Sequence, residues 1–167
     1  MAQTKKRKMN AVYFVGAGGI GMSALVRYYL SQGIVVGGYD RTACPLTEEL
    51  RAEGADIHYT DDPDLIPEAC RRPESTLVVY TPAIPHDHKE LTYFRDHQFR
   101  IMKRAEVLGT LTRTMKGLCV AGTHGKTSTS SMAAHLLHQS HVGCNAFLGG
   151  ITKNYGTNYL LNRESPY

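Results

Sequence analysis

Two glycine-rich strings, each standing between a short apolar run and a helical pattern, limit the fold of this chain more than any other feature. The first, GAGGIG at residues 16–21, follows an apolar run at 11–15, and the second, GTHGKT at residues 122–127, follows one at 118–121. Short β-branched runs that alternate with helical patterns are typical of βαβ units, in which helices cover a parallel sheet. We therefore predict the α/β class: a Rossmann-like parallel sheet flanked by helices, followed by a truncated P-loop α/β domain.

Hydrophobic periodicity predicts the individual elements. In the first unit it gives strands at residues 11–15, 34–39, 55–58, 76–80 and 99–102, and helices at residues 22–32, 47–53, 89–97 and 104–115. The prolines of TPAIP (residues 81–85) predict an irregular loop after the fourth strand, because proline cannot donate a backbone hydrogen bond. The second unit begins with a strand at 118–121, a helix at 127–139 and a strand near 144–148. We expect that helix to face inward with Met132, Ala133, Leu136 and Leu137.

The length of 167 residues suits one domain and part of another. We assign residues 1–9 to a basic disordered tail, 10–103 to a Rossmann-like domain, 104–116 to a linker helix and 117–167 to the N-terminal part of a P-loop domain. A parallel sheet needs several strands with helices on both faces, which about 50 residues cannot supply. The second domain is therefore expected to be truncated. The sequence leaves open whether its incomplete sheet is completed by self-association.

Charge and composition exclude several classes of protein. The net charge of +4 equals the four cations Lys5, Lys6, Arg7 and Lys8, so the rest of the chain is balanced and we expect no nucleic-acid partner. No apolar run approaches the roughly 20 residues needed to cross a bilayer, so we expect no membrane partner. The four cysteines form no Cys-x-x-Cys pair, which favours reduced thiols in a cytoplasmic protein.

The first glycine string matches the pattern G-x-G-x-x-G of diphosphate-binding turns. In that pattern Gly16 permits the tight turn, Gly18 lets the backbone approach a diphosphate, and Gly21 allows close helix–strand packing. The N-terminus of the following helix offers free N–H groups and partial positive charge to the phosphates. Asp40 closes the second predicted strand. Its carboxylate could accept the hydroxyls of an NAD ribose or face a uridine diphosphate.

The second glycine string departs from the Walker A pattern, because Val120 stands where that pattern has its first glycine, but its Gly-Lys-Thr core is intact. Lys126 can reach the β- and γ-phosphates of ATP, and the Thr127 hydroxyl can hold Mg²⁺. The predicted ATP-binding residues are Gly122, Thr123, His124, Gly125, Lys126, Thr127 and Ser128. An enzyme that holds a nucleotide diphosphate in one domain and activates it with ATP in the next would use both strings, whereas hydride transfer has no use for a γ-phosphate.

Five motifs carry a resemblance to a known family. They are GAGGIGMS at residues 16–23, TPAI at 81–84, RAE at 104–106, AGTHGKT at 121–127 and GGI at 149–151. In this order they resemble the Mur ligases over about residues 10–160. The resemblance implies a three-domain, ATP-dependent cytoplasmic enzyme of peptidoglycan biosynthesis, and GGIGMS favours the member that joins L-alanine to UDP-N-acetylmuramate. In that reaction the substrate carboxylate attacks the γ-phosphate of ATP, and the amine of L-alanine then takes the acyl phosphate.

The resemblance also implies site residues. The UDP-substrate would be bound by Gly16, Gly18, Gly19, Ile20, Gly21, Asp40, Thr81, Ala83 and Ile84. Catalysis would fall to Lys126, to Thr127 with Mg²⁺, and to His124, which could equally be a donor that fills the turn. The family's further acidic residues for Mg²⁺ and its alanine-binding domain would follow Tyr167, so we expect this chain to bind the UDP-sugar without catalysing ligation. Two alternatives stay open: an NAD(P)-dependent oxidoreductase domain and a non-catalytic nucleotide-binding module.

Overall fold

The computed structural model describes residues 9–167, so residues 1–8 of the predicted basic tail lie outside it. Its larger body is a five-stranded parallel sheet in the order β3-β2-β1-β4-β5. The strands are β1 (Ala11–Val15), β2 (Val35–Tyr39), β3 (Asp56–His58), β4 (Thr76–Tyr80) and β5 (Arg100–Lys103). The predicted Rossmann-like sheet is thus confirmed, and every strand lies within about one residue of its predicted position.

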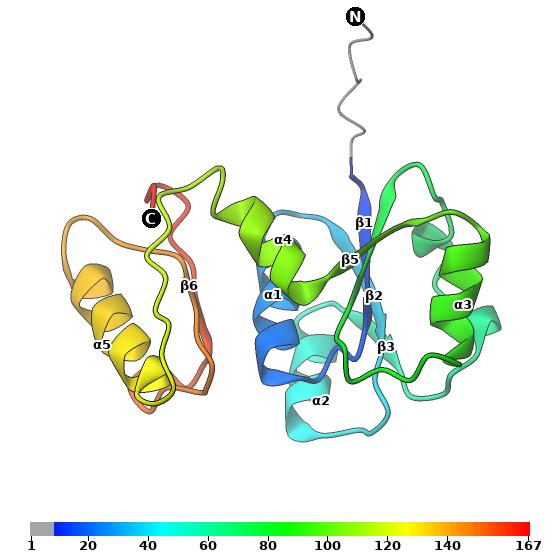
Figure 1. Cartoon of the computed structure of the whole chain (residues 1–167), viewed down its shortest axis with the longest axis horizontal. Coiled ribbons are helices and arrows are strands. Elements are labelled where there is room, and N and C mark those ends of the chain that lie inside the picture. Colours follow the sequence, from blue (N-terminus) through cyan, green and yellow to red (C-terminus); the bar gives the residue numbers. More distant parts are fainter. Residues whose placement is uncertain (1–8) are drawn as a thin grey trace, which may run out of the picture.

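Helices cover both faces of this sheet (Figure 1). One face carries α1 (Ile20–Ser31), α2 (Pro45–Ala52) and α4 (Arg104–Leu111); the other carries α3 (Lys89–Asp96) and 3₁₀ turns at Pro63–Leu65 and Glu68–Cys70. β1 is buried along its whole length because its residues alternate between two cores. Val12 and Phe14 pack with α1, whereas Tyr13 and Val15 pack with Phe94 of α3. A central strand buried on both faces is continuously apolar, as this one is.

The second unit differs from its prediction in its strands. The helix α5 (Lys126–Gln139) is confirmed, but the strand expected at 118–121 is wrong: this segment belongs to neither sheet of the described residues, and Leu118 is 64% exposed. A strand persists only where a neighbour accepts and donates its backbone hydrogen bonds. The pairing that does form is antiparallel, between β6 (Ala146–Phe147) and β7 (Tyr159–Leu160).

The inward face predicted for α5 is wrong at two positions. Ala133 and Leu137 are partly buried, but Met132 is 61% and Leu136 71% exposed. An apolar helix face is buried only where another layer covers it, and no sheet of the described residues covers this part of α5. The linker helix is also shorter than expected, because α4 ends at Leu111 and residues 112–116 continue as turns.

Aromatic and polar contacts join the second unit to α1. The ring of Phe147 lies 5.7 Å from that of Tyr28, and Phe147 packs against the core that α1 shares with the sheet. An Nη2 group of Arg163 donates a hydrogen bond to the Ser31 carbonyl, at 2.5 Å. The two units therefore share a packed boundary. Among residues 9–167, no helix combines the length and apolar character required to span a bilayer.

Candidate functional site

Three loops meet at the carboxyl edge of the parallel sheet, where ligands bind in open α/β folds. The first glycine string follows β1, and the N–H groups of Gly16 and Ala17 both donate to the Tyr39 carbonyl, at 2.8 and 3.0 Å, which ties the string to the end of β2. The loop after β4 lies directly against it: a Cβ built on Gly16 would be 3.1 Å from the Thr81 methyl and 3.3 Å from Ile84. The structure thus brings Gly16, Thr81 and Ile84 together, as expected for one site.

Asp40 reaches back into the first glycine string. Its Oδ2 accepts a hydrogen bond from the Gly18 N–H at 2.6 Å, and its Oδ1 accepts one from the Thr42 N–H at 3.3 Å. Gly18 has no room for a side chain, because a Cβ there would lie 2.6 Å from Thr47 Cγ2 and 3.0 Å from Asp40 Oδ2. Thr47 is fully buried, so it cannot yield easily. The lack of a side chain at Gly18 therefore lets the loop backbone lie close to Asp40 and Thr47 of the protein itself.

Arg104 is the first residue of α4, but its side chain lies against Gly21 in the first turn of α1. Sequence reasoning did not assign Arg104 to the site. A Cβ built on Gly21 would clash with the Arg104 guanidinium, whereas no atom of a strand is among its three nearest neighbours. The absence of a side chain at Gly21 thus makes room for this cation, and the expected role of Gly21 in helix–strand packing stays a prediction. The RAE motif placed Arg104 at the head of the linker helix, but only the fold shows that its side chain returns to the first glycine string.

The N-terminus of α1 is open to an anion. Its N-cap is Gly19, which has no side-chain cap, and its first turn contains no acidic residue. Among the described residues, the N–H groups of Gly19, Ile20 and Gly21 have no hydrogen-bond acceptor, while those of Met22 and Ser23 donate to the Gly19 carbonyl. Unsatisfied N–H groups and the helix dipole both favour negative charge here, and Arg104 adds a full positive charge.

The second glycine string is exposed throughout and opens α5. Gly122 and Gly125 adopt φ values of +149° and +76°, which side chains rarely tolerate. Lys126 Nζ donates to the carbonyls of Gly122 and Thr123, at 2.5 and 3.2 Å, so the ammonium folds over its own loop. Thr127 faces GGI: a Cβ on Gly149 would lie 3.2 Å from its hydroxyl oxygen. In Figure 1, α1 and α5 both begin at the lower edge of the view.

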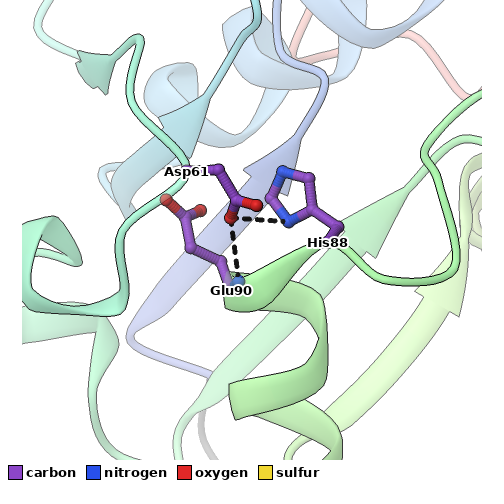
Figure 2. Close-up of side chains that lie close together, drawn as sticks. All are labelled: Asp61, His88 and Glu90. Carbon is purple, nitrogen blue, oxygen red and sulfur yellow. Dashed lines mark hydrogen bonds and ion pairs between the residues drawn. The ribbon is translucent and has the colours of Figure 1, made fainter.

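A polar cluster at the start of α3, only partly exposed, has the donor atoms of a metal centre. Asp61, His88 and Glu90 offer ligand atoms within 4.8 Å of one another (Figure 2). However, Asp61 already accepts the N–H groups of Lys89 and Glu90, at 2.9 and 3.0 Å, and its Oδ1 lies 3.1 Å from His88 Nδ1. Asp61 therefore satisfies two free N–H groups in the first turn of α3, whose N-cap is His88. We interpret the cluster as an anchor for the loop between β4 and α3, which carries Thr81 and Ile84.

Glu90 is the most unusual residue of this cluster, because it is a fully buried carboxyl in the first turn of a helix. The Tyr13 hydroxyl donates to its Oε2 at 2.6 Å, and the Asp62 N–H donates to its Oε1 at 3.2 Å. Burial raises the pKa of Glu90 to about 7. Burial also lowers the pKa values of His58 and His88 and, together with the charge of Glu90, raises that of Tyr13. An acid in a first turn usually faces water, so no sequence signal marked it.

The fold and its carboxyl-edge loops define a protein of the Rossmann-like α/β class. A family model described as "Mur ligase family, catalytic domain" matches residues 11–116, and the chain belongs to this family. The chain is 69% identical over 159 residues to a UDP-N-acetylmuramate–L-alanine ligase of Phocaeicola vulgatus and 66% identical over 160 residues to that of Parabacteroides distasonis. It spans about a third of their length: 95% and 96% of this chain cover 35% of each relative.

Solved structures share this fold. A crystal structure of the UDP-N-acetylmuramate–alanine ligase MurC from Thermotoga maritima matches with a TM-score of 0.78 and 34% identity, over 89% of this chain and 34% of that one. The UDP-N-acetylmuramate:L-alanyl-gamma-D-glutamyl-meso-diaminopimelate ligase from Neisseria matches with a TM-score of 0.79 at 23% identity, over 95% of this chain and 49% of that one, which shows the fold alone.

Proposed function

We propose that this chain carries the UDP-substrate domain (residues 10–103), a linker (104–116) and the first part of the ATP domain (117–167) of a cytoplasmic ligase of peptidoglycan biosynthesis. The ligase would join L-alanine to UDP-N-acetylmuramate with ATP. Family membership and the names of the relatives support this proposal. The observation that carries it is that each of the two glycine strings opens a helix, and that both helices begin on the same side of the view in Figure 1. Family membership also favours the ligase over the oxidoreductase and the non-catalytic module.

The first glycine string would bind the UDP-substrate. The diphosphate would accept hydrogen bonds from the N–H groups of Gly19, Ile20 and Gly21, since Asp40 already accepts that of Gly18. Arg104 would offset the charge of the diphosphate from the side of Gly21. The uridine and its ribose would lie between Asp40 and the loop formed by Thr81, Ala83 and Ile84. These groups position the substrate and carry no bond-making step themselves.

The second glycine string would bind ATP. Lys126 would exchange the two loop carbonyls that it now contacts for phosphate oxygens, which are stronger partners because they are charged. The Thr127 hydroxyl, exposed at the first turn of α5, would hold Mg²⁺, which when bound offsets negative charge on the β- and γ-phosphates. His124 lies exposed in the loop, where it could contact the transferred phosphate. The remaining donors are the backbone N–H groups of residues 124–128.

Calorimetric titration with UDP-N-acetylmuramate, with NADH as the parallel ligand, tests the first half of this proposal. We expect the UDP-sugar to bind and NADH not to bind. The variant Gly18→Val should lose UDP-sugar binding, because its side chain would press on Thr47 and Asp40 and close the approach to the loop. Gly109→Val is the matched control, since a Cβ at Gly109 in α4 meets no atom within 4 Å.

The outcomes separate the candidate functions. Binding of NADH alone would reject the ligase and favour the oxidoreductase. Binding of the UDP-sugar that survives in Gly18→Val would move the substrate away from the first glycine string. Circular dichroism of each variant shows whether the sheet is intact, so that a loss of binding can be assigned to the loop.

A further inference from the structure

The buried side chain of Asn158 connects the second unit to α1. It is fully buried, although it lies in a polar loop. Its Nδ2 group donates to the Ile20 carbonyl and, at 3.1 Å, to Ser23 Oγ. Its Oδ1 accepts a hydrogen bond from Arg27 Nη1 at 3.2 Å. All three partners lie on α1, so the second unit contacts the same helix whose N-terminus forms the first glycine site.

Arg27 is itself held firmly in place. Its guanidinium pairs with Glu49 of α2 and with Glu53, the residue that follows α2, each at 2.9 Å, and its side chain is only 12% exposed. The amide of Asn158 therefore docks on a frame that α1 and α2 have already fixed. A buried amide whose donors and acceptor are all satisfied specifies one docking geometry, because any shift would leave polar groups unpaired.

The backbone of Asn158 extends the connection to the second glycine string. Its carbonyl accepts a hydrogen bond from the Leu148 N–H at 2.9 Å, which closes residues 149–157 into a loop. Gly149 and Gly150, next in the chain after Leu148, lie against Thr127: Cβ atoms built there would be 3.2 and 3.3 Å from its side chain. The contacts thus run from the first turn of α1 through Asn158 and Leu148 to the first turn of α5.

We propose that Asn158 is a positioning residue that couples the two nucleotide sites, so that a nucleotide diphosphate on the first glycine string strengthens the binding of a nucleoside triphosphate on the second. This inference rests on the proposed function. A diphosphate bound to the N–H groups of residues 19–21 restrains the Ile20 peptide, which holds Asn158 and, through Leu148, the glycines against Thr127. The second ligand then meets an ordered loop and loses less conformational freedom on binding.

The coupling is measured by calorimetry on the whole chain with the ATP analogue AMP-PNP and Mg²⁺, with and without saturating UDP-N-acetylmuramate. We expect UDP-N-acetylmuramate to tighten AMP-PNP binding by about fivefold or more, the lower range of measured site–site couplings. Reciprocity requires AMP-PNP to tighten UDP-N-acetylmuramate by the same factor. In Asn158→Ala the factor should fall to about one, while each ligand alone still binds.

Two further variants distinguish a loss of coupling from a folding defect. Asn158→Asp preserves the shape and the acceptor for Arg27 but cannot donate to Ile20 or Ser23, and it should also lose the coupling. Asn154→Ala removes an exposed amide from the same loop and should keep it.

A wild-type factor of one, or a coupling that persists in both Asn158 variants, would overturn the inference while leaving the proposed function standing. Failure of either ligand to bind the wild-type chain alone would instead reject the proposed function, and the inference with it.

Discussion

The buried carboxyl of Glu90 makes the stability of this protein depend on pH in a direction that can be worked out. Burial raises its pKa from 4.5 to about 7, so the folded state keeps a proton that the unfolded state releases between these values. The free energy of unfolding therefore falls as the pH rises from about 4.5 to 7. At about 1.4 kcal/mol for each pKa unit, the ionised carboxyl costs the folded state ~3 kcal/mol above pH 7.

We predict that Glu90→Gln removes this loss. The test is urea unfolding followed by far-ultraviolet circular dichroism at pH 5 and pH 8, comparing wild type with the variant. Between pH 5 and pH 8, the unfolding free energy of the variant should rise relative to that of wild type by roughly 2 to 3 kcal/mol. His58 and His88, whose pKa values burial lowers, add the opposite slope below pH 6.5, but they are present in both proteins.

The matched control is Glu68→Gln, the same substitution at an exposed position in the second 3₁₀ turn. It makes the same chemical change as Glu90→Gln without removing a buried carboxyl. The groups that face Glu90 are Tyr13 from β1, His58 from β3 and Asp61 and Asp62 from the following loop. If the difference between wild type and Glu90→Gln is the same at both pH values, burial does not hold the proton on Glu90 and the reasoning is refuted.

Two further predictions concern the second unit. Lys126→Ala should weaken AMP-PNP binding by about tenfold or more, the value of a charge-assisted hydrogen bond, and leave UDP-N-acetylmuramate binding unchanged in the same calorimeter; equal affinity in both proteins would contradict the assignment of Lys126. We also propose that the chain self-associates through the exposed apolar residues Leu118, Met132 and Leu136. Leu118 lines a cavity of about 470 Å³, and Met132 and Leu136 line a second one of about 480 Å³. Sedimentation should show a dimer that the double variant Met132→Lys, Leu136→Lys converts to monomer, and a wild type that stays monomeric at high concentration would count against it.

The elements predicted most accurately are those whose signal is local. β1 and β4 are continuous apolar or β-branched runs, and their bounds were predicted without error. The helix α1 has its apolar residues at helical spacing, and Met22, Leu25 and Val26 among them are buried. Spacing along the chain suffices here because a helix or strand buries its apolar side wherever a neighbouring layer covers it.

The failures have one cause, because each depends on a partner distant in the sequence. The run at 118–121 has the composition of a strand, but no neighbouring strand of the described chain pairs with it. Met132 and Leu136 have helical spacing but no covering layer. The assignments of single residues to nucleotide and Mg²⁺ contacts stay predictions, although the structure does gather Gly16, Thr81, Ile84 and Asp40 at one edge.

The sequence by itself determined the α/β class, the bounds of most elements, the two glycine strings and the resemblance to the Mur ligases, because these are properties of neighbouring residues. Only the tertiary structure decided the strand order, the return of Arg104 to Gly21, the burial of Glu90 and the bridge formed by Asn158. Each of these joins residues far apart in the chain. Their contacts depend on how the layers pack, and no periodicity or motif encodes that packing.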